Sequence, residues 1–176
     1  MNAWLLAARP KTLAAAVVPV LVGVSLARFA HWPSFVFALL GAIFIQIGTN
    51  YVNDALDYRK GADTHERLGP LRVTQAGLLS AEAVLRGAIV CFALAAICGV
   101  PLIARGGWPI VVIGVTSIAA AYAYTGGPYP LAYHGLGELF VMVFFGIVAV
   151  CGTYYLQVLR FDRDAVLAGV ACGALA

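Results

Sequence analysis

Charge is scarce in this sequence: of 176 residues, 11 are Lys or Arg and 8 are Asp or Glu. That is 11% of the chain, whereas a soluble domain carries about 25% charged residues. With 62% hydrophobic residues and a mean hydropathy of +0.93, the chain is too apolar for a soluble domain, and we predict an integral membrane protein. The net charge of +3 is small and scattered, so no nucleic-acid partner is indicated.

Several motifs are also missing. Neither a Walker-type Gly-x-x-x-x-Gly-Lys-Ser/Thr sequence nor a Gly-x-Gly-x-x-Gly sequence occurs, which leaves nucleotide hydrolysis and dinucleotide binding without support. The four cysteines lie in apolar runs without a Cys-x-x-Cys pair, so neither a zinc site nor a disulfide framework is indicated. His65 and His134 are expected to be loop residues rather than catalysts.

Long uncharged runs predict the fold class. Five runs of 16, 25, 18, 32 and 21 residues cover residues 12–27, 29–53, 87–104, 106–137 and 139–159. About 20 residues cross a bilayer as a helix. We therefore predict an all-α, polytopic transmembrane helix bundle, with residues 1–176 forming a single membrane domain of five helices and the start of a sixth.

Turn and cap signals give the expected helix bounds, which are residues 12–27, 33–57, from the Ser80 cap to 104, 108–124, 138–159 and 165–176. Pro19 predicts a tilt or kink in the first helix. Because the last 12 residues are too few to span a bilayer, we expect the chain to be part of a longer protein.

A polar stripe occupies the last turns of the second predicted helix. Its members recur at spacings of four, three, one and three, which places them on one helical face: Gln46, Asn50, Asn53, Asp54 and Asp57. Polar side chains inside a membrane helix normally face a cavity or the interior of a bundle. The stripe runs into residues 54–86, which hold ten of the 19 charged residues.

The basic residues predict the orientation. Seven lie at the N-terminus and between residues 59 and 86, and four lie on the other side, near residues 28, 105, 160 and 163. By the positive-inside bias, the N-terminus and the loop over residues 54–82 are expected on the cytoplasmic side of the membrane.

The chemistry of this loop suggests a magnesium diphosphate site. Mg²⁺ prefers one or two carboxylates together with phosphate oxygens and water, and Asp54 and Asp57 fit that requirement. Basic side chains in the loop would supply charge-assisted bonds to a diphosphate. The alternative is a solvated loop between helices, which leaves the polar stripe unexplained. Three later tyrosines form either an interfacial belt or part of a pocket: Tyr122, Tyr124 and Tyr129.

At these residues the chain resembles a known family. The segment Asn50-x-x-Asn53-Asp54-x-x-Asp57-Tyr-x-Lys60-Gly61-x-Asp63-Thr64-x-Glu66-Arg67-x-Gly69-Pro70-x-Arg72 is similar to the first aspartate-rich motif of the UbiA-type intramembrane prenyltransferases. The Arg9-Pro10-Lys11-Thr12-Leu13 and Tyr124-Thr-Gly-Gly-Pro-Tyr-Pro-Leu segments resemble the branch that prenylates 1,4-dihydroxy-2-naphthoate in menaquinone synthesis.

The resemblance implies a bundle of about nine helices in the plasma (inner) membrane, with a cytoplasmic active site. It implies transfer of a polyprenyl group from polyprenyl diphosphate to 1,4-dihydroxy-2-naphthoate, with loss of CO₂, to give demethylmenaquinone. The expected catalytic residues are Asn50, Asn53, Asp54 and Asp57; the diphosphate-binding residues are Lys11, Lys60, Arg67 and Arg72; and the Mg²⁺ ligands are Asp54, Asp57 and Asp63. The family's second aspartate-rich motif is expected beyond Ala176.

Other interpretations remain open at this stage. The aromatic acceptor could be a hydroxybenzoate, homogentisate or haem. From other classes, the chain could be a small membrane transporter whose polar stripe lines a path, or a subunit that completes the bundle of another chain.

Overall fold

The computed structural model describes residues 2–28, 30–61 and 72–176, and every regular element in these ranges is a helix. The elements, in chain order, are α1 (Ala3–Ala8), the 3₁₀ turn η1 (Pro10–Thr12), α2 (Ala14–Leu26), α3 (Trp32–Arg59), α4 (Ala81–Gly106), α5 (Trp108–Ala123), the 3₁₀ turn η2 (Leu131–His134), α6 (Gly137–Val141), the π-helical segment η3 (Met142–Val148), α7 (Ala149–Val158) and α8 (Arg163–Ala174).

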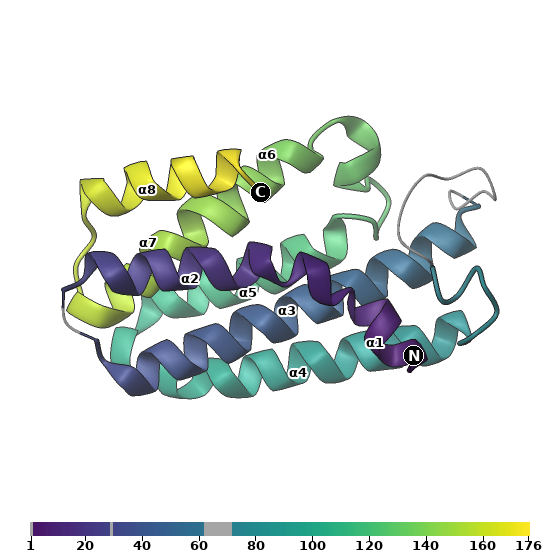
Figure 1. Cartoon of the computed structure of the whole chain (residues 1–176), viewed down its shortest axis with the longest axis horizontal. Coiled ribbons are helices and arrows are strands. Elements are labelled where there is room, and N and C mark those ends of the chain that lie inside the picture. The colour runs from purple at the N-terminus through teal and green to yellow at the C-terminus, as the bar shows by residue number, and fades with distance from the viewer. Residues whose placement is uncertain (1, 29, 62–71) are drawn as a thin grey trace.

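The long helices lie side by side along the longest axis of the molecule (Figure 1). α3 packs along α4, α2 packs on both α3 and α7, and α8 packs on η3 and α7. The short helix α1 lies against α3, near the end of the bundle where α3 finishes and α4 begins (Figure 1). Residues of α1, α3 and α4 share a buried apolar cluster, so the N-terminal segment is part of the bundle.

Three helical stretches are long and apolar enough to cross a membrane: α3, α4 and the unbroken 22 residues from α6 through α7. A fourth candidate is the bent pair formed by the segment Ala3–Thr12 and α2, and α5 is a shorter apolar helix. The predicted all-α, polytopic bundle is confirmed. Each predicted helix is present, with both ends within two residues of the expected positions.

Local signals in the sequence explain where helices begin. The Ser80 Oγ accepts a hydrogen bond from the N–H of Ala83 at 3.2 Å and caps α4, and the Asp162 carboxylate caps α8 through the N–H of Asp164 at 2.9 Å. Such caps satisfy donors that the first helical turn leaves unpaired. Gly107 links α4 to α5 with a φ of 66°, a conformation that favours glycine.

Besides the short helix α1, two features of the helices were not predicted. A bend of 47° separates the segment that ends at Thr12 from α2, whereas α2 itself continues as one helix through Pro19. The second feature is η3, where the backbone is π-helical. Here a Cβ on Gly146 would lie 2.3 Å from the carbonyl oxygen of Gly169, so the absence of a side chain lets α8 approach closely.

Candidate active site

The polar stripe of α3 holds the N-terminal segment in place. The amide nitrogen of Asn50 donates to the carbonyl oxygen of Ala8 at 2.9 Å and to the Thr12 Oγ at 3.0 Å. The amide nitrogen of Gln46 donates to the same hydroxyl at 3.3 Å. Both N–H donors of Asn50 are therefore used within the protein, so its amide oxygen is the group that can serve a ligand.

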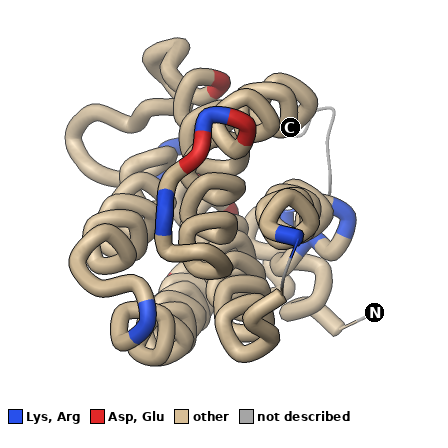
Figure 2. Tube along the Cα trace, turned by 90° about the vertical axis from the view of Figure 1, so that its left-hand side faces the viewer, with Lys and Arg blue, Asp and Glu red and all other residues tan. Residues whose placement is uncertain are grey.

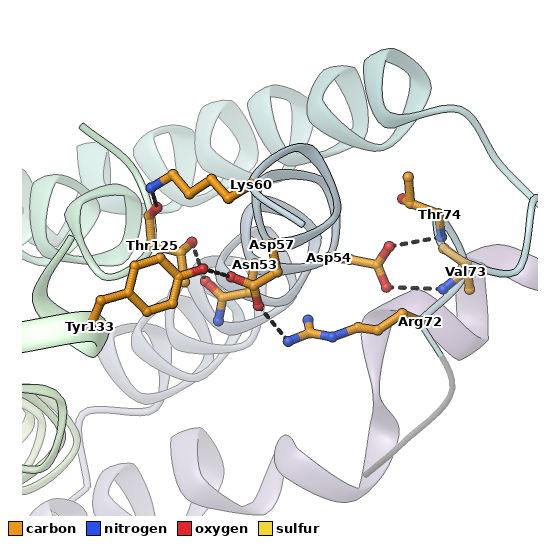
Figure 3. A network of polar contacts seen from close by, with 9 residues as sticks. All are labelled: Asn53, Asp54, Asp57, Lys60, Arg72, Val73, Thr74, Thr125 and Tyr133. Carbon is orange, nitrogen blue, oxygen red and sulfur yellow. Dashed lines mark hydrogen bonds and ion pairs between the residues drawn. The ribbon is translucent and has the colours of Figure 1, made fainter. Parts of the chain in front are cut away.

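Asp54 holds the segment that precedes α4. Its side chain is fully buried, and its two carboxylate oxygens accept hydrogen bonds from the N–H groups of Val73 at 3.0 Å and Thr74 at 2.9 Å. Figure 3 shows Asp54 extending from α3 toward this segment, on the other side of the helix from Asn53 and Asp57. The stripe predicted from spacing therefore divides at Asp54.

Asp57 is the centre of a second set of contacts. One carboxylate oxygen forms an ion pair with the guanidinium of Arg72 at 2.5 Å, and the other accepts a hydrogen bond from the Tyr133 hydroxyl at 2.5 Å (Figure 3). Asp57 and Arg72 are both buried. A buried ion pair is maintained only when its charges find such partners, so Asp57 joins segments that are 15 and 76 residues away in the chain.

The connection between α5 and α6 closes over the same end of α3. The Thr125 hydroxyl donates to the amide oxygen of Asn53 at 2.8 Å, and the Lys60 ammonium donates to the carbonyl oxygen of Thr125 at 2.6 Å. Lys60 also lies 5.2 Å from the ring centroid of Tyr133, within the range of a cation–π interaction. The Pro- and Gly-rich connection is thereby fixed to α3 (Figure 3).

The other predicted residues lie in several environments. Lys11 is exposed in η1, while Asp63 and Arg67 lie outside the described residues. His134 ends the 3₁₀ turn η2, stacks on Tyr129 with ring centroids 3.5 Å apart and contacts the carbonyl oxygen of Pro130. The His65 position is outside the described residues.

The three tyrosines considered earlier have different surroundings. Tyr122 and Tyr129 are exposed, whereas Tyr124 lines a cavity. Sequence reasoning missed Tyr133, because nothing in the spacing of a Pro- and Gly-rich connection indicates which of its tyrosines reaches α3. The recurrence of tyrosines on both sides of Pro130 was the only signal.

An apolar cavity of about 310 Å³ lies between the helices beside this polar network. Its walls come from α2, α3, α4, α5 and the α6–α7 stretch, and its lining is almost entirely hydrocarbon. Two of its lining residues adjoin the polar network: Gln46, which shares the Thr12 hydroxyl with Asn50, and Tyr124, which precedes Thr125. The site therefore combines a charged network with an apolar chamber.

The donor groups suit a hard cation in chemistry but supply only part of a ligand set. Carboxylate and amide oxygens are the ligands that Mg²⁺ prefers, and Asn53 and Asp57 lie on one side of α3. Within residues 2–28, 30–61 and 72–176, no group of three or more His, Cys, Asp or Glu side chains converges closely enough to hold a metal. A carboxylate has about four acceptor positions, so Asp54 and Asp57 keep acceptor capacity beyond their present partners.

Comparison of the sequence with known protein families gives the class of protein. Residues 16–176 match the UbiA prenyltransferase family, and the chain belongs to that family. The resemblance identified from the aspartate-rich segment is thus confirmed.

Among its curated relatives are three proteins named 1,4-dihydroxy-2-naphthoate octaprenyltransferase. The protein from Mycobacterium tuberculosis is 41% identical over 175 residues, which cover 98% of this chain and 60% of the relative. The protein from Mycobacterium leprae is 40% identical over 175 residues (98% and 59%), and that from Escherichia coli is 38% identical over 184 residues (99% and 60%). The chain spans about 60% of the length of these relatives.

Proposed function

We propose that this chain forms part of an enzyme that transfers a polyprenyl group from polyprenyl diphosphate to 1,4-dihydroxy-2-naphthoate. The observation that carries the proposal is the network around Asp57 together with an apolar cavity whose walls include Gln46 and Tyr124. A polyprenyl diphosphate has the same two parts, a charged head and a hydrocarbon tail. The names of the relatives support the aromatic acceptor.

In the proposed reaction, the bond between the first prenyl carbon and the diphosphate oxygen breaks, and a carbon–carbon bond to the naphthoate ring forms. The carboxyl group leaves as CO₂ and its bonding electrons return to the ring, which gives the reduced form of demethylmenaquinone and free diphosphate. The apolar lining of the cavity would exclude water from the allylic cation that forms as the diphosphate leaves.

The charges at the site suggest how the diphosphate would be held. The network in Figure 3 contains two carboxylates, Asp54 and Asp57, and two cations, Lys60 and Arg72. The formal charges of these four side chains sum to zero. A diphosphate therefore requires additional positive charge, which we propose Lys11 and Arg67 supply in part. Bound Mg²⁺ would neutralise further negative charge on the leaving group.

We propose that Mg²⁺ is held by Asp57 and Asp63, with the amide oxygens of Asn50 and Asn53 facing the metal and the diphosphate. Asp54, predicted as a third ligand, instead faces Val73 and Thr74 on the other side of α3 and holds that segment. The remaining positions around the ion would be taken by phosphate oxygens and water, as is usual for Mg²⁺. Arg72 would hold the Asp57 carboxylate in its present orientation.

We also propose the orientation that the basic residues predict. Residues 54–82 and the N-terminus would face the cytoplasm, with the chain in the inner membrane. An impermeant thiol reagent applied from the cytoplasmic side should label Ala76→Cys and not Arg160→Cys, since both positions are exposed. The reverse labelling pattern would require the opposite orientation.

The test of the function uses the full-length protein that the gene encodes, reconstituted in nanodiscs. With polyprenyl diphosphate, 1,4-dihydroxy-2-naphthoate and Mg²⁺, we expect prenylated naphthoquinol and CO₂, and we expect chelation of the metal to stop the reaction. Asp57→Asn should lower kcat/KM about 100-fold or more, the range found when a group that stabilises transition-state charge is removed.

The matched control is Asp164→Asn, which makes the same chemical change at the exposed start of α8 and should leave kcat/KM unchanged. Prenylation of a hydroxybenzoate or homogentisate in place of the naphthoate would show that the acceptor is wrong. Absence of any prenyl product from the folded protein would reject the enzyme proposal.

A further inference from the structure

One residue of the cavity wall carries a buried polar atom without a partner. Gln46 lines the cavity, and its exposed fraction is only 7%. Its amide nitrogen reaches Thr12, but its Oε1 has no hydrogen-bond partner within the part of the chain that the structure describes. A buried acceptor left unsatisfied destabilises a protein, so such an atom in a native fold requires an explanation.

The orientation of the Gln46 amide follows from its neighbours. The Thr12 hydroxyl donates its proton to the carbonyl oxygen of Arg9 at 3.0 Å. Toward Gln46 and Asn50 it can therefore only accept, and both side chains meet it with an amide N–H. This arrangement turns the amide nitrogen of Gln46 toward Thr12 and leaves Oε1 as the acceptor of this side chain that lacks a partner.

Two other buried side-chain atoms make a useful contrast. Across the described residues, the Thr74 Oγ and the Gln157 Nε2 also lack a partner, but neither residue lines the cavity. Gln46 differs from them because the residue that carries the unsatisfied atom also lines a space large enough for a ligand. That ligand must present a hydrogen-bond donor, because Oε1 is an acceptor.

The chemistry of the substrates selects the occupant, and this step rests on the proposed function. The prenyl tail is hydrocarbon and has no donor, and an ionised diphosphate offers acceptor oxygens. The dihydroxynaphthoate carries two phenolic O–H groups. We propose that Gln46 Oε1 accepts a hydrogen bond from a ring hydroxyl of the aromatic acceptor, which makes Gln46 a residue that positions the acceptor and determines its specificity.

The position of Gln46 suits this role. It lies one helical turn before Asn50 on the same face of α3, so a ring bound to it sits between the hydrocarbon chamber and the charged network. A site that hydrogen-bonds a substrate hydroxyl discriminates strongly against an analogue that lacks it, because the buried polar group is then left unpaired.

The experiment measures binding of the aromatic compound alone, by titration calorimetry, to the full-length protein in nanodiscs. Gln46→Met should weaken binding of 1,4-dihydroxy-2-naphthoate about tenfold, the loss expected for one hydrogen bond, and leave binding of polyprenyl diphosphate unchanged. Unmodified protein should bind one of the two mono-O-methyl ethers about tenfold more weakly than the dihydroxy compound. Gln46→Met should bind that ether and the dihydroxy compound equally.

Controls separate this effect from misfolding. Thr116→Val removes a hydroxyl that donates to its own helix at Val112, on an exposed position of α5, and should change neither affinity. Gln46→Leu provides a second apolar variant if Gln46→Met does not fold.

Unchanged affinity of the Gln46 variants for the dihydroxy compound would overturn the inference, since Oε1 would then hold only water. Weakened binding of the diphosphate alone would overturn it as well. If the dihydroxy compound binds in a Gln46-dependent way but the protein forms no prenyl product, the inference stands and the proposed function fails. If the protein forms the prenyl product but binds the dihydroxy compound equally well with and without Gln46, the proposed function stands and the inference fails.

Discussion

The two ends of the bundle both bury polar side chains, but they use them differently. We call the end where α7 finishes the α7 end, and the end where α3 finishes the α3 end. At the α7 end, the Arg105 guanidinium donates to the carbonyl oxygens of Leu156 at 2.6 Å and Gln157 at 3.0 Å, and the Tyr155 hydroxyl donates to the carbonyl oxygen of Gly106 at 3.0 Å. These bonds satisfy backbone groups that helix ends leave unpaired. No ligand is needed to explain them.

At the α3 end, side chains bind side chains from distant segments. Asp57 joins Arg72 and Tyr133, and Asn53 joins Thr125. Backbone groups must be paired in any buried helix end, whereas a network of paired side chains beside a cavity is not required by folding. The two ends therefore differ in what their buried polar side chains bind. Side chains that bind backbone groups at a helix end form a structural cap, whereas side chains that bind one another beside a cavity indicate a candidate site.

Figure 2 looks onto the α7 end and shows charge as short, separate segments on a mostly uncharged trace. Basic and acidic residues alternate in the turn between α7 and α8, where the sequence places Arg160, Asp162, Arg163 and Asp164. Such an exposed turn is typical of a membrane surface, and it lacks the concentration of buried charge found at the α3 end.

Asp54 is the member of the α3 end that resembles a cap, and its removal should have the largest effect. Asp54→Ala would leave the buried N–H groups of Val73 and Thr74 without acceptors. We expect a loss of about 3 kcal/mol in the free energy of unfolding, together with loss of prenyl transfer, because Arg72 is adjacent to the released segment. Thermal unfolding in nanodiscs and a product assay measure the two effects.

The control for this prediction is Asp54→Asn, which retains one acceptor oxygen and should lose less stability than Asp54→Ala. An Asp54→Ala protein that unfolds at the same temperature as the unmodified protein but makes no product would contradict the structural role. It would show instead that Asp54 acts directly on metal or substrate.

Removing a cap at the α7 end should reduce stability without changing catalysis. Arg105→Met eliminates two charge-assisted hydrogen bonds at the C-terminus of α7 and a favourable interaction with the helix dipole. We expect a loss of about 2 kcal/mol in unfolding free energy and an unchanged kcat/KM per folded molecule. Arg86→Met, at an exposed position of α4, is the control and should have almost no effect on either quantity.

A decrease in kcat/KM for folded Arg105→Met would break the comparison, because the α7 end would then contribute to the reaction. Such a result would point to coupling along α7 toward the cavity, whose lining includes Gly152 and Leu156.

Much of the fold could be predicted from the sequence because lipid imposes simple rules. The uncharged runs reveal the spans, and cap residues such as Ser80 reveal their ends. The 47° bend before α2 and the π-helical η3 could not be predicted, since each depends on packing between segments distant in sequence. Gly146 permits the approach of α8 only because Gly169 and Gly173 lie opposite.

The site was predictable in part for a related reason. Helical spacing placed Asn50, Asn53 and Asp57 on one face, and the structure keeps them there. The same spacing could not show that Asp54 turns to the backbone of residues 73–74, or that a tyrosine 76 residues away reaches Asp57. Those contacts depend on how loops return to the bundle, which no periodicity encodes.

One pair of tyrosines gives the smallest and most closely matched test of the difference between the ends. Tyr133→Phe and Tyr155→Phe each remove one hydroxyl, the first from Asp57 and the second from the carbonyl oxygen of Gly106. Each should destabilise the fold by about 1 kcal/mol. Only Tyr133→Phe should also lower kcat/KM, by about tenfold, because it alone releases a carboxylate of the reactive network. Equal effects of the two variants on kcat/KM would mean that the hydroxyl of Tyr133 only supports the fold, and that the α3 end is held together as the α7 end is.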